Sequence, residues 1–393
     1  MKLDITLSNP KTKQQIDIDL PARYSAIEDV LFRLNCDETI SASGRILDEY
    51  GRGAVNFYFE TCNIFELNHL ATLTQKFDDD RSSQFIGGYF LMSQKGSVNA
   101  PGAINLAMNI QSNNLVFSQP AMDERDLAEF YLDNDLIPEL ADVSDDIYQW
   151  IVDHTNLQEL GEEILQKENG TFISGDYVTM EELETLYDGN SPMPFPEPYV
   201  FKLEVGFHPD NDDGSRYSLP LPVSHSEIER VVQEMEVTDL SELTCYKMHS
   251  IVPSLEPMDF DMTEIETVNQ LATSIAYFKE TGELNTYKAL VDALDIIYLE
   301  AVHNLCEYVS EFELKASERD FASYGRNRFQ NILPEELLEC LDTEDYGRKI
   351  AEKNGVSMTE YGALVPKDGV PLMEKLAQLK EAQNQTTAME QTM

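Results

Sequence analysis

The residues of this chain that could do chemistry are carboxylates gathered in one stretch. They alternate with apolar residues at near-helical spacing, so they fall on the faces that a folded helical segment leaves to solvent. Carboxylates stay ionised at neutral pH and accept bidentate contacts from arginine, which suits them to a basic protein surface. We predict a partner-binding acidic face made of Asp126, Glu129, Asp133, Asp135, Glu139, Asp142, Asp145, Asp146, Asp153, Glu159, Glu162 and Glu163.

The same stretch carries enough apolar residues to fold. The predicted core residues are Leu127, Phe130, Tyr131, Leu136, Ile137, Leu140, Ile147, Tyr148, Trp150, Ile151, Leu160 and Ile164. Residues 120–190 hold 20 acidic and 2 basic residues. The alternative to a binding face is a solvated surface with few lysines. Because ordinary surfaces intersperse both signs of charge, we favour a face selected for binding.

The charge imbalance extends over the whole chain of 393 residues. Asp and Glu number 72 against 28 Lys and Arg, a net charge of −44. Like charges repel within a compact protein and destabilise it, so such an excess calls for a function. Nucleic acid and anionic membranes are excluded as ligands, because both are polyanions. The hydrophobic content of 42% and aromatic content of 9% separate the chain from acidic disordered proteins.

Other chemistries find little support in the sequence. Asp210 to Gly214 (DNDDG) is similar to the start of a calcium loop, but its glycine comes one position early and Leu221 replaces the final glutamate, so we predict a turn. No HExxH, P-loop, GxGxxG or GxSxG motif occurs. A carboxylate pair of the glycosidase type stays an alternative that no spacing selects. We therefore predict no catalytic residue, no metal and no cofactor.

The cysteines and the N-terminal residues indicate a cytoplasmic protein. The five cysteines are scattered, odd in number and without a CxxC pair, as in a reducing compartment: Cys36, Cys62, Cys245, Cys306 and Cys340. The start, MKLDITLSNP, lacks the apolar region of a signal peptide, and no apolar run reaches the length of a membrane span.

The elements that must position the acidic face recur in two halves. Prolines alternate from Pro192 to Pro198 and predict an extended connector. Residues 25–30 (SAIEDV) match 226–231 (SEIERV), each with an N-terminal serine that we expect to cap a helix. Later matches keep the same order while their offset drifts from 201 to 185 residues. We also expect the pair Gly87-Gly88 to end a helix.

These matches predict an α+β fold made of two tandem copies of a three-part unit, elongated in form. The predicted parts are 1–63 (β-rich, copy one), 64–118 (helical), 119–187 (acidic, mixed α/β), 188–198 (proline-rich linker), 199–260 (β-rich, copy two), 261–313 (helical), 314–366 (C-terminal part of copy two) and 367–393 (a disordered tail that opens with a short helix). The second C-terminal part is the milder, since residues 318–353 hold 9 acidic and 6 basic residues.

Several stretches resemble the ArdA antirestriction proteins. The stretch LAEFYLDNDLIPEL, followed by DIYQWI and by LQELGEEILQKENGTFISGDYV, is similar to their C-terminal part, and its ending runs from Gly170 to Tyr177. In copy two the similar stretches are 345–351 (DYGRKIA) and 355–362 (GVSMTEYG). Residues 68–71 (NHLA) and 103–106 (AINL) resemble the helical middle of the family.

The resemblance implies a function. ArdA proteins are acidic DNA mimics of mobile elements, elongated dimers that occupy the DNA-binding groove of type I restriction–modification enzymes. At the charge density of B-DNA, about one charge per 1.7 Å, 44 net charges would cover roughly 75 Å. This chain departs from the family as a tandem fusion with a milder second half, so we expect either a monomeric pseudo-dimer or a homodimer. The alternatives are inhibition of another defence nuclease, such as a CRISPR effector, and an acidic chaperone of basic proteins.

Overall fold

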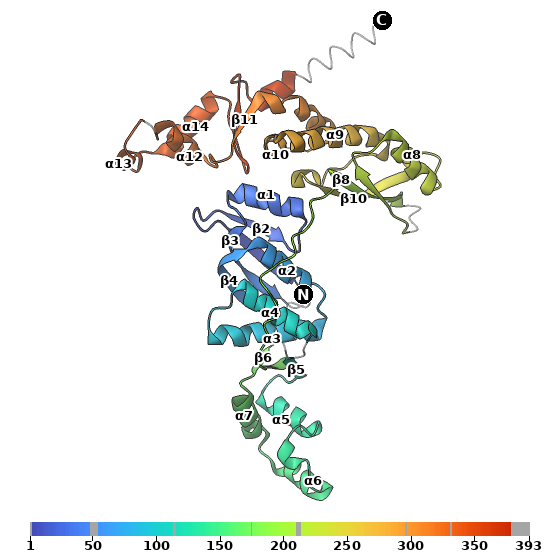
Figure 1. Ribbon diagram of the computed structural model, residues 1–393, viewed down its shortest axis with the longest axis vertical. Helices are drawn as coiled ribbons and strands as arrows, with labels where there is room; N and C mark the ends of the chain where they lie inside the picture. Colours follow the sequence, from blue (N-terminus) through green and yellow to red (C-terminus); the bar gives the residue numbers. More distant parts are fainter. Residues whose placement is uncertain are drawn as a thin grey trace. The chain divides into compact units, whose positions relative to one another are not determined.

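The computed structural model describes residues 2–47, 54–112, 115–173, 175–209, 214–294, 297–330 and 332–378 (Figure 1). The chain divides into two units, Met1–Phe195 and Pro196–Met393. The boundary lies within the proline-rich segment 188–198, which contains no helix or strand. Both units mix helices with small antiparallel sheets, so the chain is an α+β protein.

The first unit opens with a four-stranded antiparallel sheet. Its strands are β1 (Lys2–Ser8), β2 (Gln15–Asp19), β3 (Thr39–Leu47) and β4 (Ala54–Asn63), in the order β2-β1-β3-β4. Alternate side chains of a strand point to opposite faces, so Ile5 and Leu7 are buried while Asp4 is exposed. Helix α1 (Tyr24–Leu34) buries Ile27, Val30 and Leu34.

Both serines that we expected as helix N-caps lie inside their helices. Helix α1 follows Arg23, which makes no side-chain capping bond, so Ser25 is its second residue and is buried. Helix α8 (His225–Glu234) follows Ser224, so Ser226 is also its second residue. In each case the helix begins one residue before the serine that we expected to cap it.

Three helices complete the core of the first unit. They are α2 (Ile64–Thr74), α3 (Asp79–Lys95) and α4 (Ala100–Ser112). We expected Gly87 and Gly88 to end a helix, but they lie buried within α3. A Cβ on Gly87 would sit 2.6 Å from Cβ of Val178, and one on Gly88 would sit 2.8 Å from Cδ1 of Leu106. The pair therefore allows close packing of α3 against its neighbours.

The last part of the first unit carries the predicted acidic face. Its elements are β5 (Val116–Pro120), α5 (Glu124–Asp133), η1 (Pro138–Leu140), α6 (Asp145–His154), α7 (Leu157–Glu168), β6 (Thr171–Ile173) and β7 (Asp176–Met180). The strands pair in the order β5-β7-β6. Because β5 begins at Val116, the helical part ends a few residues before our boundary at 118. We call residues 121–173 the acidic module.

A glycine lets two helices of the acidic module touch backbone to backbone. Helices α5 and α7 pack around Leu127, Tyr131 and Ile164, which are buried. A Cβ on Gly161 of α7 would lie 1.7 Å from the carbonyl oxygen of Glu124 on α5. No side chain larger than hydrogen fits there without moving the helices apart.

The second unit opens with a three-stranded sheet followed by helices. Strands β8 (Phe201–Phe207), β9 (Tyr217–Leu221) and β10 (Leu243–Ser250) pair in the order β10-β8-β9. Short 3-10 helices, η3 (Leu240–Glu242), η4 (Pro253–Leu255) and η5 (Met262–Glu264), precede and follow β10 in the chain. Residues 210–213, where we predicted a turn, lie outside the described residues.

The middle of the second unit is helical. Helices α9 (Ile265–Thr281), α10 (Leu284–Asp292) and α11 (Leu299–Asn304) are followed by η6 (Leu305–Glu307) and η7 (Val309–Glu311). The buried residues of α9 include Val268, Leu271, Ile275 and Phe278, which recur every three or four positions.

The second unit closes with its own small module. It contains β11 (Phe312–Lys315), α12 (Phe321–Phe329), α13 (Glu335–Leu338), α14 (Thr343–Lys353), β12 (Ser357–Thr359) and β13 (Gly362–Pro366), with strand order β11-β13-β12. In this module Gly347 of α14 lies against the backbone of α12. A Cβ at this position would be only 1.9 Å from the carbonyl oxygen of Phe321.

One kind of hydrogen bond from an asparagine side chain occurs in both units. In the first, the side-chain oxygen of Asn68 on α2 accepts a hydrogen bond of 2.7 Å from the backbone nitrogen of Ala22. In the second, the side-chain oxygen of Asn269 on α9 accepts one of 2.9 Å from the backbone nitrogen of Val223. Each asparagine thus ties a core helix to the turn that precedes α1 or α8.

The start of the segment predicted as a disordered tail is packed. Residues 372–378 are helical, as the short helix expected there would be, and Leu372 and Lys375 are buried. The ammonium group of Lys375 lies 2.5 Å from a carboxylate oxygen of both Glu311 and Asp368. Residues 367–378 therefore belong to the folded second unit, and 379–393 lie outside the described residues.

Substituting Gly161→Ala should loosen the acidic module. The methyl group would collide with a backbone carbonyl, and overpacking of this kind costs about 1–3 kcal/mol. Hydrogen exchange should speed up in residues 121–173 and change little in the sheet of β1–β4. The matched control is Gly96→Ala, where a Cβ meets nothing within 4 Å. Equal protection of α5 and α7 in both variants would contradict the contact.

Substituting Lys375→Met should destabilise the second unit, because two carboxylates lose their charged donor. The hydrogen bond from Lys375 holds the pKa of Asp368 below its usual value, with help from the backbone nitrogen of Val370. A depressed pKa stabilises the fold above the carboxyl's unfolded value, about 4, and this contribution is lost as the pH falls through the folded value. Exchange protection of 372–378 should therefore drop on acidification in the native chain and stay flat in the variant.

Candidate functional site

The structure places all twelve predicted acidic residues in the acidic module, on or between α5, η1, α6 and α7. Eleven of them are exposed, and Asp126 is half-buried in the first turn of α5. The carboxylate of Asp126 accepts a hydrogen bond of 3.2 Å from the backbone nitrogen of Met122. Asp126 therefore helps to form the start of the helix, while the other eleven side chains face solvent.

Helix α6 is fastened beside the end of α5 by Tyr148. Its hydroxyl donates a hydrogen bond to the backbone oxygen of Leu132, the last but one residue of α5. Desolvation, and then the negative charges of Asp135 and Asp133, raise the pKa of Tyr148. The carboxylates at the end of α5 and just after it thus lie close to Tyr148 of α6, and the acids of the two helices share one region of surface.

A buried tyrosine pair supports this region from beneath. The hydroxyl of Tyr131 on α5 donates to the carboxylate of Glu168 on α7, at 2.8 and 2.7 Å from its two oxygens. Tyr177 on β7 reaches the same carboxylate at 3.4 Å. Burial first, and the neighbouring carboxylate of Glu168 second, raise the pKa of both hydroxyls, so they stay protonated donors. Sequence reasoning did not find this cluster, because its members come from three distant elements.

The acids of the module have few cations to neutralise them. Residues 123–168 contain 15 acids and two bases, Arg125 and Lys167. Across this fully described stretch, the ion pair present is Arg125–Glu129, at 3.2 Å. The remaining carboxylates present an uncompensated negative potential to solvent.

The corresponding module of the second unit treats its acids differently. Glu344 pairs with Arg348 at 2.7 Å, Asp345 pairs with Lys349 at 2.6 Å, and Glu335 pairs with Arg326. These pairs lie on the surface of α12–α14 and cancel much of the local charge. The two modules therefore share an arrangement of elements and differ in the charge that they show.

Three apolar residues that we predicted in the core of the acidic module are exposed. The exposed fractions are 41% for Leu136, 55% for Ile147 and 62% for Trp150. Helix α6 has no buried residue at all. For Ile147 and Trp150 the prediction was wrong because α6 carries apolar residues on more than one side, and the side that contacts α5 is the one with Tyr148.

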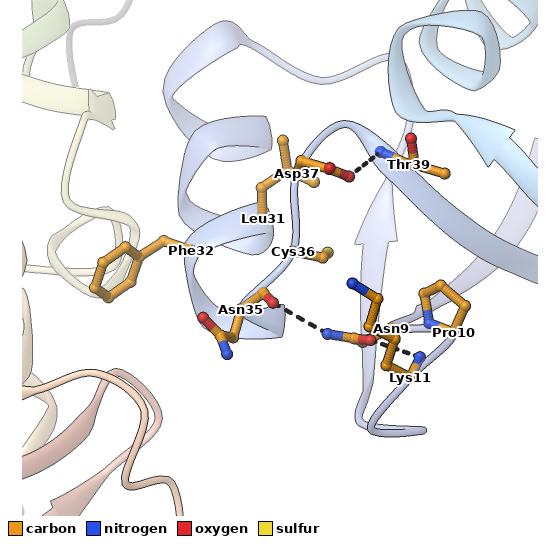
Figure 2. Close-up of a pocket in the computed structure, with 9 residues that line it drawn as sticks. All are labelled: Asn9, Pro10, Lys11, Leu31, Phe32, Asn35, Cys36, Asp37 and Thr39. Atoms are coloured by element: carbon orange, nitrogen blue, oxygen red, sulfur yellow. Dashed lines mark hydrogen bonds between the residues drawn. The ribbon is translucent and has the colours of Figure 1, made fainter.

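A recess beside α1 offers a different kind of site (Figure 2). It encloses about 590 Å³ and is lined by Asn9, Pro10, Lys11, Leu31, Phe32, Asn35, Cys36, Asp37 and Thr39. Its polar groups already bond within the fold. The side-chain nitrogen of Asn9 donates to the backbone oxygens of Leu34 and Asn35, at 2.8 and 3.1 Å, and the carboxylate of Asp37 accepts from the backbone of Thr39.

Three of the five thiols are poorly suited to nucleophilic chemistry. Burial, and then the charge of Asp37, raise the pKa of Cys36 to about 11. Burial likewise raises the pKa of Cys62 to about 12 and that of Cys306 to about 12. Since the thiolate is the reactive form, these side chains are unreactive near neutral pH.

Metal and membrane sites were sought throughout the described part of the chain. Over those residues, no three or more His, Cys, Asp or Glu side chains converge so as to hold a metal ion. Within the same ranges, every helix is too short or too polar to cross a membrane. What the acidic module can do chemically is to present carboxylates, a tryptophan and an isoleucine to a partner.

Comparison with known proteins does not assign the chain to a family. No protein-family model matches it, and no curated protein matches it significantly.

Proposed function

We propose that the protein is a DNA mimic that inhibits a type I restriction–modification complex by occupying its DNA-binding groove. On this proposal the protein acts by binding rather than by catalysis, inside the bacterial cytoplasm, and without a cofactor. The observation that carries the proposal is the acidic module, where eleven predicted carboxylates are exposed on a packed scaffold with one ion pair among them. The resemblance to ArdA proteins supplies the target class.

The geometry of a helical surface supports this use. Acids three or four residues apart on a helix, such as Glu159, Glu162 and Glu163 on α7, have neighbouring Cβ atoms roughly 5–6 Å apart. Each strand of B-DNA advances about 3.4 Å per phosphate, so the two spacings are of the same order. Lysines and arginines placed to contact phosphates would therefore meet carboxylates at similar intervals, and arginine can bind each carboxylate with two hydrogen bonds.

We also propose that the two units are diverged copies of one ancestral unit. The three-stranded sheets β5-β7-β6 and β11-β13-β12 have the same order, and Gly161 and Gly347 occupy equivalent contacts between helices. The hydrogen bonds of Asn68 and Asn269 add a third correspondence. The first copy would then keep the acidic face, while the ion pairs of the second would reduce its contribution to mimicry.

Competition with DNA is the direct test of the function. The protein should displace a labelled duplex from a purified type I restriction–modification complex and block its cleavage. Its affinity should fall at least about tenfold between 50 and 200 mM salt, because charge dominates the contact. If the protein instead binds the complex without displacing the duplex, and binds polylysine equally well, it would be an acidic chaperone of basic proteins. Displacement of DNA from a CRISPR effector alone would move the target to another defence nuclease.

Neutralising carboxylates of the acidic module should weaken inhibition. The variant Asp145→Asn, Asp146→Asn, Glu163→Gln removes three exposed charges from α6 and α7. At about 0.2–1 kcal/mol for each exposed charge pair, the affinity should fall roughly 3- to 150-fold, with a shallower salt dependence.

The matched control removes three exposed charges from the second unit's module, through Glu336→Gln, Glu339→Gln and Glu352→Gln. Both variants lose the same net charge, so a non-specific effect of charge would weaken them equally. Stronger weakening by the first variant, with unchanged unfolding curves for both, is expected. Equal weakening would argue against the acidic module as the contact.

A further inference from the structure

Helix α6 presents two different faces to solvent. One turn of an α-helix contains 3.6 residues, so Ile147, Trp150 and His154 lie along one side. Ile147 is 55% exposed and Trp150 is 62% exposed. The rings of Trp150 and His154 stack with centroids 4.4 Å apart, and a ring nitrogen of His154 lies 2.8 Å from the backbone oxygen of Trp150. This side is an ordered aromatic surface, which we call the Trp150 face.

The other two sides of α6 are accounted for. Tyr148 turns toward α5, where its hydroxyl is bonded to the backbone oxygen of Leu132. Asp146, Gln149 and Asp153 form an acidic side, on which Gln149 donates to Asp153 at 3.1 Å. The three sides are roughly 120° apart on the helix. A surface helix normally needs one apolar stripe, the one that faces its core, and the Trp150 face is a second apolar stripe, which the contact with α5 leaves exposed.

The charge around the Trp150 face restricts what can cover it. Residues 123–168 hold 15 acids and two bases. A second copy of this chain would bring an equally acidic surface against this one, and such like-charge contacts cost several kcal/mol. The negative surface of a membrane is disfavoured for the same reason. The surface complementary to this face is a basic one that contains an apolar or aromatic recess.

We propose that the Trp150 face is the anchor by which the acidic module docks on its partner, with Trp150 inserted in an apolar recess bordered by lysine and arginine. The inference rests on the proposed function and specifies it. In a DNA-binding groove, basic residues hold the phosphates while aromatic or apolar side chains take the bases. The acids of α6 then stand in the place of phosphates, and the stacked Trp150–His154 pair stands in the place of a base.

The chain offers a direct probe, because Trp150 is its sole tryptophan. Biosynthetic replacement by 5-hydroxytryptophan allows this residue to be excited apart from the tryptophans of a partner. In the free protein its emission should be quenched readily by acrylamide, as its exposure requires. On addition of a purified type I restriction–modification complex, the quenching should fall and duplex DNA should restore it. If the emission of the free protein resists acrylamide at every protein concentration, another part of this chain covers Trp150, and the proposal is overturned. If it resists acrylamide only at high protein concentration, a second copy covers Trp150, and the proposal is again overturned.

The variant Trp150→Ala should bind the same complex at least about 30-fold more weakly, as truncation of an interface anchor does. Its salt dependence should match that of the native chain, because no charge is removed. The control is Tyr58→Ala on β4, whose side chain has the same exposed fraction of 62%. Unchanged thermal unfolding of both variants would exclude loss of folding as the cause.

The outcomes separate the anchor from the function itself. If Trp150→Ala displaces DNA as well as the native chain does, the anchor is refuted while DNA mimicry stands. If neither protein displaces DNA from the complex, the proposed function fails and the anchor fails with it. If Tyr58→Ala weakens binding as much as Trp150→Ala, the effect does not belong to the Trp150 face, and the proposal is again refuted.

Discussion

The close contact of α5 with α7 is the constraint on which the acidic module depends. These helices carry carboxylates that repel one another, and few cations offset the repulsion. Their attraction comes from a small buried cluster that includes Leu127 and Ile164, and from the absence of a side chain at Gly161, which lets the backbones meet. Packing of apolar surface does not rely on attraction between charges, which salt screens, so it can hold the acids in place where ion pairs cannot.

The hydrogen bonds of Glu168 link the elements that carry the other acids of the module. Its carboxylate is taken up by Tyr131 and Tyr177, whose hydroxyls stay protonated because burial raises their pKa. Because the Glu168 carboxylate accepts hydrogen bonds from neutral tyrosine hydroxyls, it needs no cation as a partner. These bonds therefore link α5, α7 and β7 without a lysine or arginine. In the second unit, the equivalent helices combine the same glycine contact with surface ion pairs such as Glu344–Arg348. The packing is shared, and the charge is the part that differs.

Much of this arrangement could be predicted from local patterns. The positions of helices follow from apolar residues spaced three and four apart, and the acids of α6 and α7 face solvent because they fall between those positions. Contacts between distant elements could not be predicted in this way. Nothing local marks Gly87 and Gly88 as a packing site inside α3 rather than a helix end, since the neighbours that require them, Val178 and Leu106, come from elsewhere in the chain. The bond from Tyr131 to Glu168 is hidden for the same reason.

The exposure of Trp150 was hidden by an ambiguity in the pattern itself. Tyr148 and Ile151 have the same spacing as Ile147 and Trp150, so the sequence alone does not say which pair faces the core. The structure decides it, because the Tyr148 hydroxyl finds a backbone acceptor at the end of α5, whereas the indole does not turn inward. The choice has a consequence for recognition. A surface of charges alone gives fast, salt-sensitive association with many basic partners, whereas an apolar anchor must find a matching recess. An acidic module that carries both can select one basic partner among the many that its charge attracts.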